Sequence, residues 1–214
     1  MQLVSEFARL RRSANKRLIL LRILADSCVQ PVTPVVDQRV SFIVIEALNL
    51  WASFVRSYYL SCAVMQPLRE SGARVTIGLA GIHDSVDALA VSIRTLKPRV
   101  TWGPPWSRND EPAWHAPGTL VTLARAINSS NQPEIAAAFG YSTKVFQYLP
   151  SVRNFFAHRN EETADRIVNV ARSYRLNPKL RPSEILCSNV PRRPQSLMSD
   201  WLDDLRLTVS LLCQ

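Results

Sequence analysis

Residues 37–63, DQRVSFIVIEALNLWASFVRSYYLSCA, contain the longest helical pattern in the chain. When successive residues are placed about 100° apart, as in an α-helix, the large apolar side chains fall within one arc. These residues are Val40, Ile43, Val44, Ala47, Trp51, Phe54, Val55, Tyr58 and Cys62. The stretch therefore predicts a long amphipathic helix with one strongly apolar face.

The opposite side of this predicted helix carries a regular polar stripe. Glu46, Asn49, Ser53 and Arg56 follow one another at steps of three, four and three residues. Two interpretations of the stripe stay open, because a polar helix face either meets solvent or lines a polar groove or subunit interface.

Helical patterns also occupy most of the remaining sequence, at about residues 2–25, 83–96, 118–129, 133–139, 145–149, 161–171 and 195–212. Residues 99–117 break the pattern with three tryptophans and four prolines, which indicates an ordered loop. Residues 172–193 hold six basic residues, one acid and several prolines, which predict an extended chain. We predict one all-α domain over residues 1–214, with a core at about 36–175 and a C-terminal helix at about 195–212.

The composition favours a polyanionic partner. Lys and Arg number 26 against 17 Asp and Glu, a formal net charge of +9. Four widely spaced cysteines lie beside apolar residues, as reduced core thiols of a cytosolic protein do. The apolar run at 18–24 is interrupted by Arg22 and is too short to span a bilayer. We therefore expect a cytoplasmic protein without a membrane partner.

The residues that indicate chemistry lie in residues 148–163, YLPSVRNFFAHRNEET. Arginine offers a planar, permanently charged fork for phosphate, and histidine is the side chain that exchanges protons near neutral pH. Asn154 can orient a hydroxyl, a phosphate oxygen or the imidazole. On one regular helix Asn154 and His158 share a face, whereas Arg153 points about 140° away from His158. Joint action of Arg153 and His158 then requires a break of the helix near Asn160 or a second copy of the chain that completes the site.

Other catalytic constellations are missing from the sequence. The three histidines are far apart, and no carboxylates are paired at ligand spacing, so we expect neither a metal nor a cofactor. No phosphate-binding glycine loop and no nucleophile elbow is present. Acid–base chemistry without a metal favours RNA as substrate, because its 2′-hydroxyl is an internal nucleophile.

The sequence from Arg153 to His158, RNFFAH, resembles the R-x4–6-H motif of HEPN domains, including the polar residue that follows the arginine. The resemblance implies a helical bundle and a metal-independent endoribonuclease that acts as a homodimer with a composite active site. Arg153, Asn154 and His158 would then carry catalysis, with Glu46, Asn49 and Arg56 as weaker candidates for a supporting polar shell. Toxin–antitoxin and anti-phage defence systems are the usual setting, which implies an antitoxin or another defence-system protein as a partner.

One position departs from the family. HEPN toxins that are silenced by nucleotidylation carry a tyrosine two residues after the histidine, where this chain has Asn160. Control by that modification is therefore not expected. The alternative function is a catalytically inert HEPN-like helical module that binds nucleic acid or a partner protein.

Overall fold

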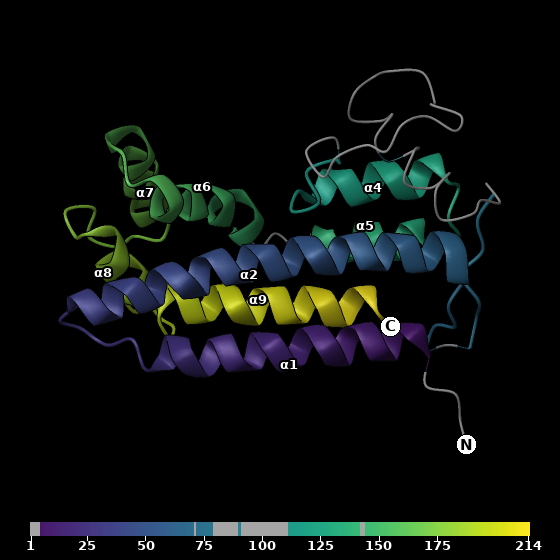
Figure 1. The fold of residues 1–214 in the computed structure, drawn as a ribbon, viewed down its shortest axis with the longest axis horizontal. Helices are drawn as coiled ribbons and strands as arrows, with labels where there is room; N and C mark the ends of the chain where they lie inside the picture. Colours follow the sequence, from purple (N-terminus) through teal and green to yellow (C-terminus); the bar gives the residue numbers. More distant parts are fainter. Residues whose placement is uncertain (1–4, 71, 79–89, 91–110, 142–143) are drawn as a thin grey trace. The chain divides into compact units, whose positions relative to one another are not determined.

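The computed structural model describes residues 5–70, 72–78, 90, 111–141 and 144–214. Within these residues the chain is helical, with two isolated bridges and no strand, which confirms the all-α prediction. The elements are α1 (Glu6–Asp26), α2 (Pro34–Leu60), the π-helical turn η1 (Ser61–Met65), α4 (Pro117–Ala126), α5 (Gln132–Gly140), α6 (Val145–His158), α7 (Glu161–Ser173), α8 (Pro182–Cys187) and α9 (Leu197–Leu212) (Figure 1). The helix expected at 83–96 and residues 99–110 of the tryptophan loop lie outside the described residues.

The chain divides into two compact units. The first comprises Met1–Ser13, Trp51–Ser142 and Thr208–Gln214, and the second comprises Ala14–Leu50 and Thr143–Leu207. The motif at residues 153–158 belongs to the second unit. The extent of the predicted domain and of its core stays a prediction.

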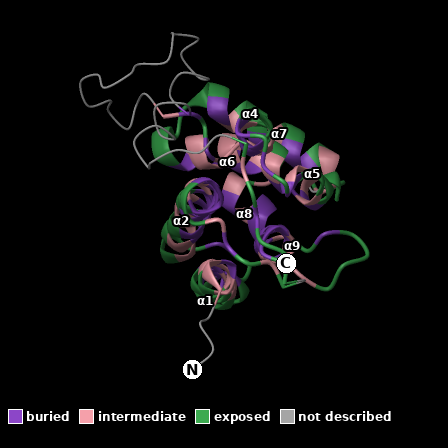
Figure 2. Ribbon diagram, turned by 90° about the vertical axis from the view of Figure 1, so that its right-hand side faces the viewer, coloured by how far each residue is buried: buried purple, intermediate pink, exposed green. Residues whose placement is uncertain are grey.

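The apolar arc predicted for residues 37–63 is the buried face of α2 and, at Cys62, of η1. All nine of its apolar residues are buried, while Asn49 and Ser53 of the polar stripe are exposed (Figure 2). The regular α-helix ends at Leu60, and the chain continues as the π-helical turn until Gln66 adopts a left-handed backbone conformation. The periodicity therefore predicted the buried face correctly. It also continued past Leu60, where the chain no longer forms the hydrogen bonds of an α-helix.

In the second unit, α1 lies against both α2 and α9. Arg17 on α1 forms an ion pair with Glu46 on α2 at 3.5 Å, and Arg39 on α2 donates a hydrogen bond to Ser27. Towards α9, Arg22 donates a hydrogen bond to the carbonyl of Ser199. Because residue 17 pairs with 46 and residue 27 with 39, α1 and α2 run antiparallel.

The basic segment 172–193 is not extended throughout, which corrects the prediction. Pro182 occupies the first turn of α8, where the missing N–H of proline costs no hydrogen bond, so this proline opens a helix and does not extend the chain. Glu184 accepts a hydrogen bond from the Arg181 backbone N–H at 2.8 Å and closes the start of the helix. A short helix opened by proline gives a pattern too brief for apolar periodicity to reveal.

Asn160 is the N-cap residue of α7. Its side-chain oxygen accepts a hydrogen bond from the Thr163 backbone N–H at 2.9 Å. We expect Asn160→Ala to lower the free energy of unfolding by about 1 kcal/mol, because one N–H at the helix start loses its partner. Urea denaturation measures this loss. Asn169→Ala, an exposed amide on the same helix, is the matched control, and an equal loss in both variants would reject the capping role.

Asp204 on α9 makes stability depend on pH. Burial raises its pKa to about 6, and the charges of Asp200 and Asp203 add to this while Arg193 opposes it. Because the folded protein holds this proton more tightly than the unfolded chain, Asp204 destabilises the fold progressively between about pH 4 and pH 6 and fully above pH 6. Asp204→Asn should therefore raise the free energy of unfolding by about 1–2 kcal/mol at pH 8 and hardly at pH 4. Denaturation at both pH values checks this, and a pH-independent effect would contradict it.

Among the described residues, one helical stretch, Pro34–Met65, is long and apolar enough to cross a membrane by length and composition. Half of its most apolar window is buried inside the protein, and core helices of soluble proteins pass the same criterion. This stretch is therefore weak evidence for a membrane span.

Candidate functional site

The three motif residues lie on the last two turns of α6. Val152 and Phe156 are buried and fix this part of the helix, and α6 packs against α7. Arg153 and Asn154 are half-buried, while His158 is exposed. The motif therefore presents its polar groups at the surface, with its apolar members holding the helix in place.

The structure joins two of the three motif residues directly. Nη1 of Arg153 donates a hydrogen bond to Oδ1 of Asn154 at 3.4 Å, at the long end of the usual range. Among the described residues, His158 has no hydrogen bond to either of them, and Arg153 forms no ion pair. Its guanidinium is therefore not neutralised by a carboxylate of the described chain.

The helix is unbroken from Arg153 to His158, so the side chains of these two residues leave α6 about 140° apart. Asn154 and His158, four residues apart, emerge on the same face. The helix break expected near Asn160 is present, because α6 ends at His158, Arg159 has a left-handed backbone with φ 46°, and α7 begins after Asn160. Since this break follows His158, it leaves Arg153 and His158 on the same helix.

Arg159 is a site residue that the sequence pattern did not reveal. Its Nη2 donates to Oδ2 of Asp37 at 2.8 Å and to Oγ of Ser41 at 3.0 Å, both on α2. Its guanidinium also lies over the ring of Phe156, 5.6 Å from the centroid. These contacts tie the end of α6 to the start of α2. Asp37 and Ser41 are 122 and 118 residues from Arg159 in sequence, so no local pattern marks them.

A cavity of about 220 Å³ lies beside this contact, within the second unit. It is lined by Val32, Asp37, Phe155, Arg159, Arg181, Pro182 and Ser183. Burial alone would raise the pKa of Asp37, but hydrogen bonds from Ser183 and Arg159 and the charges of Arg159 and Arg181 outweigh it and lower the pKa. Asp37 therefore stays ionised and neutralises Arg159, whereas Arg153 has no carboxylate partner among the described residues.

The supporting polar residues have contacts of their own. Glu46 is half-buried and pairs with Arg17, and Asn49 is exposed. Arg56 belongs to the first unit, where its Nε donates to Oε2 of Glu111 at 2.9 Å. No hydrogen bond or ion pair between described residues joins Glu46 or Asn49 to the motif, and their supporting role stays a prediction.

The described end of the tryptophan loop packs onto the first unit. Trp114 is buried, donates its indole N–H to Glu111 at 2.6 Å and lies 5.7 Å from the ring of Tyr59. The carbonyl of His115 accepts a hydrogen bond from Trp51 at 3.1 Å. This part of the loop is ordered by packing, as its aromatic content indicates.

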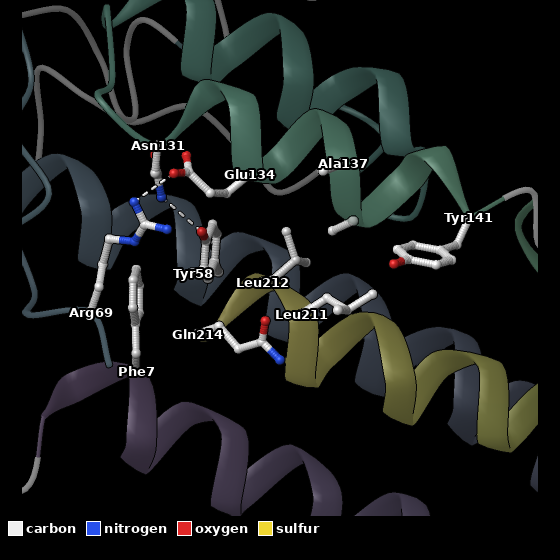
Figure 3. A pocket seen from close by; sticks show the side chains of 11 residues that line it. Phe7, Tyr58, Arg69, Asn131, Glu134, Ala137, Tyr141, Leu211, Leu212 and Gln214 are labelled. Atoms are coloured by element: carbon white, nitrogen blue, oxygen red, sulfur yellow. Dashed lines mark hydrogen bonds and ion pairs between the residues drawn. The ribbon is translucent and has the colours of Figure 1, made fainter. Parts of the chain in front are cut away.

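The first unit also contains a cavity of about 240 Å³ that sequence reasoning missed (Figure 3). At one end Nη1 of Arg69 donates to Oε1 of Glu134 at 2.6 Å, and Asn131 donates to the hydroxyl of Tyr58 at 2.8 Å. Tyr141 lies at the opposite end (Figure 3). Oε2 of Glu134 is buried and accepts no hydrogen bond from a described residue. The cavity therefore has largely apolar walls and one hydrogen-bond acceptor, Oε2 of Glu134, that receives no hydrogen bond from a described residue.

Thiol chemistry is not supported by the cysteines. Cys28, Cys62, Cys187 and Cys213 are all buried and free. Burial raises the pKa of Cys62, Cys187 and Cys213 to about 12 each, and it raises the pKa of Cys28 as well. All four therefore stay protonated near neutral pH, and a protonated thiol is a poor nucleophile and metal ligand.

The fold and the site define an all-α protein that presents arginine, asparagine and histidine at the surface of one helix. Protein-family models, curated proteins and solved structures give no match to this chain. In the described ranges, no group of three or more His, Cys, Asp or Glu side chains is arranged to hold a metal ion.

Proposed function

We propose that the protein is a metal-independent endoribonuclease of the HEPN type that acts as a homodimer, in a toxin–antitoxin or anti-phage defence setting. The observation that carries the proposal is the surface of α6. It offers an arginine without a carboxylate partner among the described residues, hydrogen-bonded to an asparagine that shares a helix face with His158. The net charge of +9 supports a polyanionic substrate.

The roles of these groups follow from the chemistry of RNA cleavage. His158 takes the proton of the 2′-hydroxyl, the 2′-oxygen bonds to phosphorus, and the bond from phosphorus to the 5′-oxygen breaks. Arg153 stabilises the negative charge that develops on the phosphate oxygens. The leaving 5′-oxygen receives its proton from a general acid, a role that His158 of a second copy fills in a composite site. The products are a 2′,3′-cyclic phosphate and a 5′-hydroxyl.

A second copy is part of the proposal because of the helix geometry. Arg153 and His158 leave one unbroken helix in different directions, so a composite site can draw the arginine from one copy and the histidine from the other.

The test is RNA cleavage in excess EDTA by the wild type, Arg153→Ala and His158→Ala. The wild type should cleave RNA, leave a cyclic phosphate detectable by mass spectrometry, and fail on a substrate with a 2′-deoxy sugar at the cleavage position. Arg172→Ala, an exposed arginine on α7, is the matched control for lost positive charge. Cleavage that persists in both motif variants would refute the proposal. RNA binding without cleavage by the wild type would favour the inert binding module instead.

A further inference from the structure

The cavity of about 220 Å³ that contains Asp37 lies at the end of α6, beside the motif, and we call it the Asp37 cavity. Two of its lining residues, Phe155 and Arg159, flank His158 in the sequence. Phe155 leaves α6 about 60° from His158 but about 160° from Arg153. A ligand in the cavity therefore lies on the side of the helix that carries His158. Pockets for drug-sized ligands measure about 300–1,000 Å³, so this smaller cavity suits a single ring system.

One wall of the Asp37 cavity is an aromatic ring that is held in place. Phe155 is half-buried, and its ring meets the buried ring of Phe156 edge-on, with the centroids 5.1 Å apart. Phe156 is itself covered by the guanidinium of Arg159. Fixed aromatic rings of this kind are the surfaces on which proteins stack the bases of single-stranded RNA.

The polar wall of the cavity has unused hydrogen-bonding groups. Oδ1 of Asp37 accepts a hydrogen bond from Ser183, and Oδ2 accepts one from Arg159. A carboxylate oxygen has two lone-pair sites, so each oxygen keeps one, and the Asp37 side chain is 30% exposed. Nη1 and Nε of Arg159 donate no hydrogen bond to a described residue. The cavity therefore offers two acceptors next to free N–H donors.

The charges around the cavity are balanced, which favours an uncharged ligand group over a phosphate. Arg159 pairs with Asp37, and Arg181 pairs with Glu184, each at 2.8 Å. The pKa of Asp37 is lowered by its hydrogen bonds and by the neighbouring arginines, so the carboxylate is ionised. A phosphate in the cavity would meet this like charge, whereas a neutral base would not.

We propose that the Asp37 cavity binds a guanine base of the RNA substrate. Guanine carries two adjacent N–H donors on its Watson–Crick edge, N1–H and the 2-amino group, next to the O6 acceptor. The two donors match the two oxygens of Asp37, and O6 matches an N–H of Arg159. Adenine, cytosine and uracil each have an acceptor directly beside their donor, and that acceptor would face the carboxylate with a lone pair. The cavity therefore selects guanine.

Because the guanine belongs to the RNA substrate, this inference rests on the proposed function. Binding of the base, however, is measurable without cleavage.

The first test is binding of the four nucleoside 5′-monophosphates to the full chain, measured by isothermal titration calorimetry. Guanosine 5′-monophosphate should bind at least about tenfold more tightly than the other three, the usual discrimination of a bidentate contact. Inosine 5′-monophosphate, which lacks the 2-amino group, should bind about tenfold more weakly than the guanosine nucleotide. Ribose 5-phosphate measures the contribution of the phosphate alone.

Two variants assign this preference to the cavity. Asp37→Asn should abolish the preference for guanine, because an amide offers one acceptor in place of two. Phe155→Leu should weaken binding of all four nucleotides about fivefold or more through lost stacking. Asp165→Asn, an exposed carboxylate on α7, and Phe42→Leu, an exposed phenylalanine on α2, are the matched controls and should bind like the wild type. A melting curve accompanies each variant.

Three results of this titration would overturn the proposal. They are equal binding of the four nucleotides, binding of ribose 5-phosphate as tight as that of guanosine 5′-monophosphate, and an unchanged preference in both cavity variants.

The second test separates a base of the RNA from a free guanine nucleotide. RNA substrates that differ in one base are cleaved in EDTA, and the cleavage positions are mapped by sequencing. The wild type should cleave next to guanine, and Asp37→Asn should lower the ratio of cleavage at guanine to cleavage at adenine about tenfold. Cleavage that ignores guanine, in a protein that binds guanosine 5′-monophosphate, would reject the RNA base and assign the cavity to the free nucleotide.

The two proposals fail in different ways. A wild type that prefers guanosine 5′-monophosphate and loses this preference in Asp37→Asn, yet cleaves no RNA, would reject the ribonuclease and keep the guanine site. A wild type that cleaves RNA without a base preference and binds the four nucleotides equally would reject the guanine site alone.

Discussion

Replacing His158 with alanine should lower the rate of RNA cleavage by about 10²- to 10⁴-fold, the usual contribution of a positioned general acid or base. The side chain is exposed at the end of α6, so its loss removes a reacting group without leaving a hole in the core. The rate is measured under single-turnover conditions in EDTA, with a melting curve for each variant.

Two comparisons make this result specific to catalysis. His158→Ala should bind a substrate with a 2′-deoxy sugar at the cleavage position as tightly as the wild type, because the imidazole acts on a proton and not on the phosphate. Arg153→Ala should lower both cleavage and this binding, since the guanidinium is the proposed phosphate ligand. A His158→Ala variant that loses binding and cleavage to the same degree would assign the residue to the interface with RNA instead.

Replacing Trp201 with alanine should cost about 3–5 kcal/mol of unfolding free energy, as the loss of a fully buried large aromatic side chain usually does. Trp201 lies on α9 in the second unit with 2% of its surface exposed. Its indole N–H donates to the hydroxyl of Tyr174 at 2.8 Å, which ties α9 to the residue that follows α7. The substitution therefore removes both packing and an inter-element hydrogen bond.

A graded series separates these two contributions. Tyr174→Phe keeps the ring and leaves the indole N–H without its acceptor, which should cost about 1–3 kcal/mol. Leu207→Ala, at an exposed position of α9, should stay within about 0.5 kcal/mol of the wild type. Denaturant unfolding gives all three values. If Trp201→Ala cost no more than Leu207→Ala, Trp201 would not be part of a cooperative core.

The helical class and the buried face of α2 were predictable, because apolar residues in one arc of a long helix have few other uses. Asn160 was predictable as well, since capping is a local interaction between residues three positions apart. The beginning of α8 was not, because Pro182 stops or starts a helix according to its position, and the sequence pattern does not give that position.

In the candidate site too, features set by residues close in sequence were predictable, and contacts between residues far apart in sequence were not. Spacing along one helix predicts that Asn154 and His158 share a face. It does not predict that Arg159 binds Asp37 and Ser41, because these residues meet only when α6 and α2 are folded together. Leu24 illustrates the converse, since it follows the buried Leu18 and Leu21 at helical spacing, yet it is exposed. Periodicity predicts on which side of a helix a side chain lies. Whether that side is buried depends on the neighbouring elements.

The junction between α6 and α7 consists of Arg159 and Asn160 alone. Both residues are fixed by the surrounding structure. Arg159 has a left-handed backbone and donates a hydrogen bond to Asp37 on α2, and Asn160 accepts a hydrogen bond from the Thr163 backbone N–H. One inserted residue at this junction would detach one of these anchors or require the chain to loop out between them. Among related sequences we therefore expect the interval from Arg153 to Thr163 to keep a constant length, with insertions and deletions accepted elsewhere.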